Sequence, residues 1–180
     1  FDKRLVVGGA VLAAIVLLTS TVIPLALLIL SYRVNAWLGA GVESVLCYYM
    51  LAARCLRDES MKVHRAFLEN DTEKARKAVS MIVGRDTEPL DRNGIIRAAV
   101  ETVAENSSDG VTAPMLYMGL GGAPLGFFYK AANTMDSMIG YTSEKYIQIG
   151  RAAAKLDDLL NYIPSRLTAL LMILSAGILR

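Results

Sequence analysis

The most constraining feature of this sequence is an uncharged apolar run near its start. Residues 5–30 contain no Asp, Glu, Lys or Arg. As an α-helix this run would be roughly 39 Å long, which exceeds the ~30 Å hydrocarbon core of a bilayer. It is also longer than the apolar region of a signal peptide. We therefore predict a membrane-spanning helix over 5–30.

A second apolar segment follows after the short polar break at 31–35. Residues 36–53 carry one charge, Glu43, so the two segments predict a transmembrane hairpin. The 54% of hydrophobic residues in the chain exclude a soluble globule and a disordered chain, and the two cysteines exclude a disulfide scaffold. The net charge of +2 gives no basic surface for nucleic acid.

Residues 54–97 form a charged insertion. They hold ten Lys or Arg and eight Asp or Glu residues, with apolar positions at helical spacing. This pattern predicts two water-facing helices, at about 55–69 and 72–83. The protein is expected in the inner cell membrane. Because basic loops stay on the cytoplasmic side of a membrane, the insertion is expected to face the cytoplasm.

Residues 98–162 are a region of polar motifs around an uncharged stretch at 111–129. That stretch contains Pro114, Pro124 and four glycines, so a straight span and a re-entrant or broken helix are both compatible with it. Residues 163–180 are apolar again and predict the start of a further transmembrane helix. The whole chain, 1–180, is thus expected to be one all-α, polytopic membrane domain.

The first polar motif is an acidic stripe. Arg97, Glu101, Glu105 and Asp109 recur every four residues, so one continuous helix would align them, with Asn106 beside them. Stacked carboxylates repel unless a cation lies between them, and such oxygen ligands suit Mg²⁺ shared with phosphates. The alternative is an Arg97–Glu101 surface pair on a solvated face.

Two further motifs place polar groups at the ends of apolar runs. Lys130, Asn133 and Asp136 follow the Gly/Pro-rich stretch, where ionisable groups at membrane depth often mark functional sites. The alternative is interfacial snorkelling by Lys130 and helix capping by Asn133 or Asp136.

The third motif lies before the last apolar segment and consists of Asp157, Asp158, Asn161 and Arg166. An arginine there can bind a phosphate or carboxylate through two parallel hydrogen bonds. The alternative is that Arg151 and Lys155 pair with Asp158 on a solvated helix. The fourth motif, Arg85 and Asp86 within 83–87, is by itself a turn.

Four stretches carry a resemblance in their order along the chain: VGRDT (83–87), RAAVETVAENSSDGVTAP (97–114), GGAPLGFFYKAANTMDSMIGY (121–141) and KLDDLLNYIPSRLTALL (155–171). They resemble the CobD/CbiB family of adenosylcobinamide-phosphate synthases, integral membrane enzymes of cobalamin biosynthesis. The family's N-terminal His-Pro segment and C-terminal portion have no counterpart, so the chain is expected to be a central fragment.

The resemblance implies an ATP- and Mg²⁺-dependent amide synthetase. Its substrates would be adenosylcobyric acid and (R)-1-aminopropan-2-ol or its O-phosphate, and its partners the lipid bilayer and other membrane enzymes of cobalamin synthesis. The expected catalytic residues are Glu101, Glu105, Asp109 and Asp136, the first three being the expected metal ligands. The expected substrate- or nucleotide-binding residues are Arg85, Asp86, Asn106, Lys130, Asn133, Asp157, Asp158, Asn161 and Arg166.

Two other classes of function remain open at this level. Membrane proteins resembling AmpE belong to the same broad superfamily and imply a non-catalytic sensory role. A transporter could also carry intramembrane charges on broken helices, although no internal repeat supports one.

Overall fold

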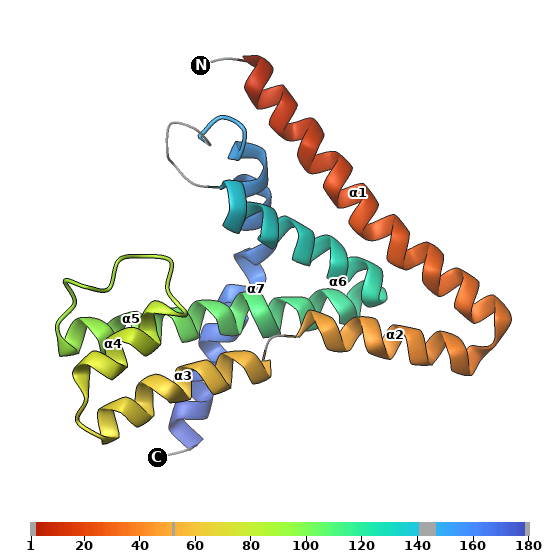
Figure 1. The fold of residues 1–180 in the computed structure, drawn as a ribbon. Coiled ribbons are helices and arrows are strands. Elements are labelled where there is room, and N and C mark those ends of the chain that lie inside the picture. Colours follow the sequence, from red (N-terminus) through yellow and green to blue (C-terminus); the bar gives the residue numbers. More distant parts are fainter. Residues whose placement is uncertain (1–2, 52, 141–146, 179–180) are drawn as a thin grey trace.

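Every regular element of the structure is a helix. The computed structural model describes residues 3–51, 53–140 and 147–178, and no strand occurs in these ranges. Figure 1 shows the arrangement. The elements are α1 (Lys3–Val34), α2 (Ala36–Met50), α3 (Ala53–Leu68), α4 (Thr72–Ser80), α5 (Arg92–Ser107), the π-helix η1 (Ser108–Thr112), α6 (Ala113–Ile139) and α7 (Arg151–Ile178).

Four helical stretches are long and apolar enough to cross a membrane. They are Lys3–Val34, Ala36–Leu68, Arg92–Ile139 and Arg151–Ile178. Most of the large apolar side chains of α1 are exposed, as expected for a helix that presents them to lipid. These findings confirm the prediction of an all-α, polytopic membrane protein.

The first two helices form a hairpin. The α1 helix extends past residue 30 to Val34, and within it Ser31 Oγ donates to Leu27 O (2.8 Å). Asn35 then caps α2, since its side chain accepts a hydrogen bond from Trp37 N (2.7 Å). The α2 helix ends at Met50, three residues before the end expected from the apolar run.

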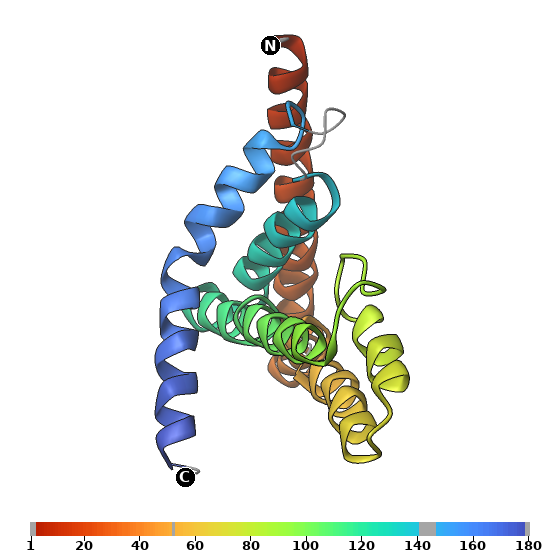
Figure 2. The ribbon, with the colours of Figure 1, turned by 90° about the vertical axis from the view of Figure 1, so that its left-hand side faces the viewer.

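The charged insertion folds around a small core of its own. Residues of α3, α4 and α5 supply its buried side chains: Val63, Ala66, Ala75, Val79, Ile95 and Ala98. The two helices expected at 55–69 and 72–83 are present as α3 and α4, although α4 ends at Ser80. Asp71 begins α4 by accepting a hydrogen bond from Lys74 N (2.8 Å). Figure 2 shows α4 on one side of α5 and α6, and α7 on the other.

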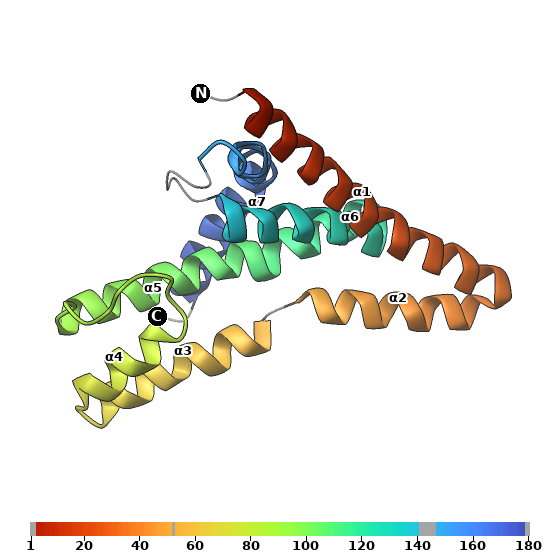
Figure 3. The same cartoon turned by 45° about the horizontal axis from the view of Figure 1, so that its top comes forward.

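The Gly/Pro-rich stretch doubles back within α6. Gly121 and Gly122 leave the helical conformation, and Gly122 has φ +65° and ψ −166°. The two arms lie side by side. The Tyr117 ring of the first arm stacks on the Tyr129 ring of the second, with centroids 5.0 Å apart. Of the two alternatives for 111–129, the structure has the re-entrant, broken helix. Figure 3 shows α1 passing over α6 near the turn between its arms. Ala13 of α1, Met135 of the second arm and Ala153 of α7 share a core.

The turn between the arms predicts a specific effect of Gly122→Ala. The conformation of Gly122 is essentially restricted to glycine, and a Cβ there would lie 2.9 Å from Glu43 Oε1. We expect the substitution to lower the free energy of unfolding by about 1–3 kcal/mol. Unfolding in mixed micelles measures it. Gly119→Ala, where nothing lies within 4 Å of the added Cβ, is the control and should be neutral or slightly stabilising; equal losses would contradict the prediction.

The last helix covers two segments that the sequence pattern had divided at residue 163. Residues 151–178 form one helix, α7, with Pro164 buried inside it, whereas the hydropathy pattern placed the start of an apolar helix at 163. Residues 141–146 of the expected polar region lie outside the described residues. The consequence is that Asp157, Asn161 and Arg166 lie on one continuous helix that packs against α6 and η1.

Candidate functional site

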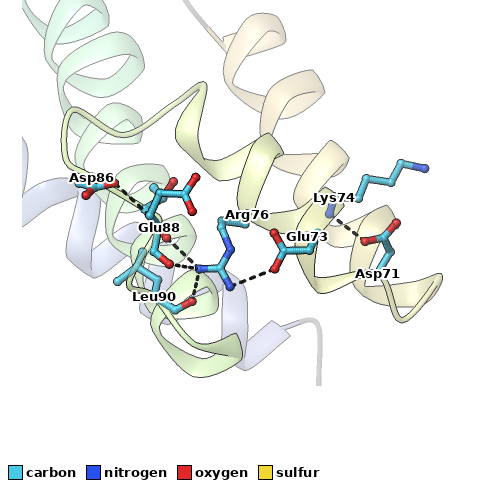
Figure 4. A network of polar contacts seen from close by, with 8 residues as sticks. Asp71, Glu73, Lys74, Arg76, Asp86, Glu88 and Leu90 are labelled. Carbon is cyan, nitrogen blue, oxygen red and sulfur yellow. Dashed lines mark hydrogen bonds and ion pairs between the residues drawn. The ribbon is translucent and has the colours of Figure 1, made fainter.

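The loop that carries Arg85 and Asp86 is held by an arginine of α4. Arg76 donates to the backbone oxygens of Thr87 (3.0 Å), Glu88 (2.7 Å) and Leu90. Figure 4 shows its guanidinium between Glu73 and the Glu88–Leu90 stretch of the loop. Its other nitrogen pairs with Glu73 (3.3 Å), and the Arg76 side chain is only 16% exposed. The loop between α4 and α5 therefore has a fixed shape. Arg76 was not among the predicted site residues, because in the sequence it is one of several basic residues in a row of charges.

This arrangement predicts that Arg76→Met will loosen the loop. The substitution leaves three carbonyl oxygens without their shared donor, which should cost about 2 kcal/mol of local stability. Amide hydrogen exchange over 83–91 should then be roughly 30-fold faster. Lys77→Met is the control, because it removes the same charge from an exposed neighbour on α4. Unchanged exchange in Arg76→Met would show that the loop is held by other contacts.

Glu101 is already paired with two arginines. Its Oε1 accepts from Arg97 Nε and its Oε2 from Arg85 Nη2, both at 2.8 Å. The Arg97–Glu101 pair is the surface pair that the sequence left as an alternative, and all three side chains are exposed. The ion pair with Glu101 thus holds the side chain of Arg85, a loop residue, against α5.

A π-helical turn separates Asp109 from the rest of the acidic stripe. The stripe was expected on one regular helix, but η1 widens the turn at 108–112 and changes the register. Asp109 instead accepts a hydrogen bond from Asn133 Nδ2 (3.2 Å). Residues 3–51, 53–140 and 147–178 contain no group of three or more His, Cys, Asp or Glu side chains that could hold a metal ion. Metal binding by Glu101, Glu105 and Asp109 stays a prediction, and they do not converge as a set.

A buried polar network links η1, α6 and α7. Asn133 donates to Asp109 and also to Asp157 (3.3 Å), and Asp157 accepts a second bond from Asn161 Nδ2 (2.9 Å). Tyr129 completes the network by donating to Asn161 Oδ1 (2.7 Å). Asn133, Asp157 and Tyr129 are buried. The structure therefore joins three predicted residues, Asn133, Asp157 and Asn161, to Asp109, and it adds Tyr129, which lies four residues before Asn133 on the same helical face.

A polar cleft of about 660 Å³ lies beside this network. It brings together three stretches that are far apart in the sequence: the 83–87 loop, the middle of α5 and the end of α6. Its polar side chains are Arg85, Glu101, Thr102, Glu105, Asn106, Asp136 and Ser137. Five of these were predicted from the sequence, and Thr102 and Ser137 were not. A cleft that presents three carboxylates and an arginine can bind phosphate groups together with a metal ion.

Four predicted residues lie outside both the cleft and the buried network. Lys130 lines a separate, mostly apolar cavity of about 420 Å³ between α1 and α6. The side chain of Arg166 contacts Tyr162 of the same helix, α7. Its guanidinium carbon lies 3.6 Å from the centre of the Tyr162 ring, and its Nη1 donates a hydrogen bond to Tyr162 O (2.6 Å). Asp158 is exposed on α7. Asp86 accepts from Glu88 N (3.0 Å) and faces a second polar cleft, beside α4.

The fold and the site define a helical membrane protein with a polar cleft where a charged insertion meets a re-entrant helix. The chain matches the family model described as CobD/Cbib protein over residues 2–180 and belongs to this family. It is 48% identical to the cobalamin biosynthesis protein CobD of Clostridium perfringens, over 100% of this chain and 57% of that protein.

Two further relatives agree with this assignment. The chain is 49% identical to the cobalamin biosynthesis protein CobD of Halalkalibacterium halodurans, over 92% of this chain and 52% of that protein. It is 45% identical to the cobalamin biosynthesis protein CbiB of Salmonella arizonae, over 99% and 56% respectively. The chain thus spans about half the length of the curated relatives it matches. No solved structure matches it.

Proposed function

We propose that this chain forms the catalytic core of an adenosylcobinamide-phosphate synthase. The reaction joins the free carboxylate of adenosylcobyric acid to (R)-1-aminopropan-2-ol or its O-phosphate. Membership of the CobD/CbiB family supports this proposal, as does the naming of its relatives as cobalamin biosynthesis proteins. Because the chain spans about half of those relatives, the activity is proposed for the complete protein.

The single observation that carries the proposal is the cleft. It places Arg85, Glu105 and Asp136 around one space, although they lie on a loop and two different helices. Formation of an amide from a carboxylate needs an activated acyl group and stabilisation of phosphate charge, and it needs no protein nucleophile. The cleft supplies charges of both signs and has no cysteine or histidine in its lining.

The proposed reaction has two steps. An oxygen of the substrate carboxylate attacks the γ-phosphorus of ATP, so that ADP leaves and an acyl phosphate forms. The amine nitrogen then attacks the acyl carbon, the bond to the phosphate oxygen breaks, and the nitrogen gives up one proton. Arg85 would bind the transferred phosphoryl group, and Asp136 or Glu105 would accept the proton.

Glu105 and Asp136 are the residues that fit Mg²⁺. Magnesium is usually held by one or two carboxylates together with substrate phosphates, and these two line the same cleft without an ion pair of their own in the described part of the chain. When bound there, Mg²⁺ would neutralise phosphate charge. Glu101 is a weaker candidate for a Mg²⁺ ligand than its place in the acidic stripe indicated, because Arg85 and Arg97 already neutralise its charge.

The location follows from the same proposal. The charged insertion would lie at the cytoplasmic face of the cell membrane, where ATP is present and where basic segments remain. The bilayer and other membrane enzymes of cobalamin synthesis are the proposed partners. The cleft at the end of α6 would then open toward the cytoplasm.

The test is a direct assay of amide formation. The complete protein, purified in detergent, is incubated with adenosylcobyric acid, either amine donor, ATP and Mg²⁺. We expect one ADP for each amide detected by mass spectrometry. Failure to form the amide with both donors, in a protein that remains folded, would overturn the proposal and favour a sensory role of the AmpE kind.

A further inference from the structure

The charged insertion carries an apolar groove beside the last helix. The groove has a volume of about 420 Å³ and lies between α3, α5 and α7. Its apolar walls come from all three helices and include Val63, Phe67, Ile96, Val100 and Met172. Ile96 and Val100 are 42% and 61% exposed, respectively. Apolar side chains that gather on an exposed surface often mark a place where another molecule binds.

The groove is a third face of α5, distinct from the two described above. Ile95 faces the core of the insertion, and Glu105 lines the polar cleft. Ile96, Val100 and Val103 follow one another at helical spacing on the remaining side of the helix. The groove therefore belongs neither to the core that holds the insertion together nor to the cleft proposed for the reaction.

Among the described residues, two basic side chains and no acidic one line the groove. Arg92 lies over the Phe67 ring, with its guanidinium carbon 5.2 Å from the ring centre, and His64 lines the same groove. None of the ion pairs between described residues involves Arg92. The ring contact uses the face of the guanidinium, whereas its N–H donors point outward in the plane. Arg92 can therefore donate hydrogen bonds to an anion at the edge of the groove.

The groove adjoins a surface that faces lipid. Met172 lies in the apolar second half of α7, a helix that is long and apolar enough to cross the membrane. Leu171 and Ile173, on either side of it, are exposed as well, as expected of side chains that contact acyl chains. A ligand in the groove therefore meets an apolar surface at α7 and basic side chains at the insertion. This combination matches an amphiphile with a negatively charged head group.

We propose that the groove between α3, α5 and α7 binds one anionic phospholipid of the cytoplasmic leaflet. Its phosphate accepts hydrogen bonds from Arg92 and His64, and one acyl chain lies along Phe67, Val100 and Met172. Basic pockets beside membrane helices on the cytoplasmic side are known to bind such head groups. The site is separate from the polar cleft and does not depend on the amide-forming reaction.

The first test is thermal unfolding of the complete, delipidated protein in detergent, without nucleotide, Mg²⁺ or substrate. Phosphatidylglycerol, phosphatidylcholine with the same acyl chains, and inorganic phosphate are titrated in three series at constant ionic strength. We expect a saturable rise in Tm with phosphatidylglycerol only, roughly 5–10 °C when its concentration is about 100 times its Kd. Equal responses to the two lipids would overturn the proposal, as would the same rise with inorganic phosphate, which would indicate an anion site without a lipid.

A photoreactive phosphatidylglycerol with a diazirine in its acyl chain then locates the lipid. Mass spectrometry of the digested protein should find the label within 60–67 or 96–103, the segments of α3 and α5 that line the groove. An excess of unlabelled phosphatidylglycerol should remove it. Labelling confined to other lipid-facing segments, such as α1, would overturn the proposal, because another part of the complete protein or a second copy would then cover the groove.

Variants separate the head-group contact from the chain contact. Arg92→Gln should weaken the apparent affinity for phosphatidylglycerol roughly 10-fold or more, because it removes a charge-assisted hydrogen bond. Val100→Asp places a carboxylate in the groove at an exposed position and should abolish the labelling. Arg65→Gln is the control, because it removes the same charge from an exposed position of α3 outside the groove. Unchanged affinity in Arg92→Gln, or unchanged labelling in Val100→Asp, would contradict this location.

Discussion

Replacing Asp136 with asparagine should lower the rate of amide formation on the order of 100-fold or more. Asp136 is the half-buried carboxylate that α6 places in the cleft, facing the side of α5 that carries Glu105. Asparagine keeps the size and the hydrogen bonding of the side chain but removes the negative charge that would hold a metal ion or accept a proton. Loss of one such group costs about 10²–10⁴-fold in well-studied enzymes.

The measurement is kcat and KM of the purified complete protein over a titration of Mg²⁺. If Asp136 holds the metal, raising the Mg²⁺ concentration should restore part of the lost rate, whereas loss of a general base would leave kcat low at all concentrations. Asp58→Asn is the matched control, because Asp58 is an exposed carboxylate paired only with Arg54 (3.8 Å). A variant at Asp136 with full activity would remove the cleft from the mechanism.

Replacing Asn133 with leucine should have the largest effect on stability. The side chain of Asn133 is buried and donates to Asp109 and Asp157 at once, so leucine leaves the half-buried Asp109 and the buried Asp157 without this donor. Removing one partner from a buried charged interaction typically costs about 3–5 kcal/mol. We expect a loss of this size in the free energy of unfolding, measured in mixed micelles at pH 7.

Thr134→Val is the control for this prediction. Thr134 is the next residue on α6, is exposed and has a side chain of similar size to valine. Its substitution should change the free energy of unfolding by less than about 0.5 kcal/mol. If Asn133→Leu were equally mild, the network would not contribute to holding α6 against η1 and α7.

The acidic stripe shows how far spacing alone can predict a site. A period of four residues aligns side chains only while the helix is regular, and this holds for Arg97 and Glu101, which pair as expected. It fails after Ser107, because η1 inserts a wider turn and Asp109 instead accepts a hydrogen bond from Asn133 on α6. A π-helical turn depends on the packing around it, so the sequence pattern does not show it.

The charged residues of α6 and α7 show a second limit. Asn133, Lys130 and Asp136 were grouped because they are close in the sequence. A helix distributes neighbouring residues around its axis, however, so Asn133 faces the network, Asp136 the cleft and Lys130 an apolar cavity on another side. Ligand binding by Arg166 stays a prediction; its guanidinium lies over the ring of Tyr162, four residues earlier on the same helix.

The sequence by itself determined the helical membrane class, the charged insertion and the residue types of the site. Those properties depend on composition and periodicity, which act locally: an uncharged run of this length must be helical in a bilayer, and a Gly/Pro-rich run resists a straight helix. Only the tertiary structure decided which polar groups meet. Three features bring these groups together: the re-entrant turn at Gly122, the π-helical turn of η1 and the loop held by Arg76. Each of them aligns segments that are distant in the chain.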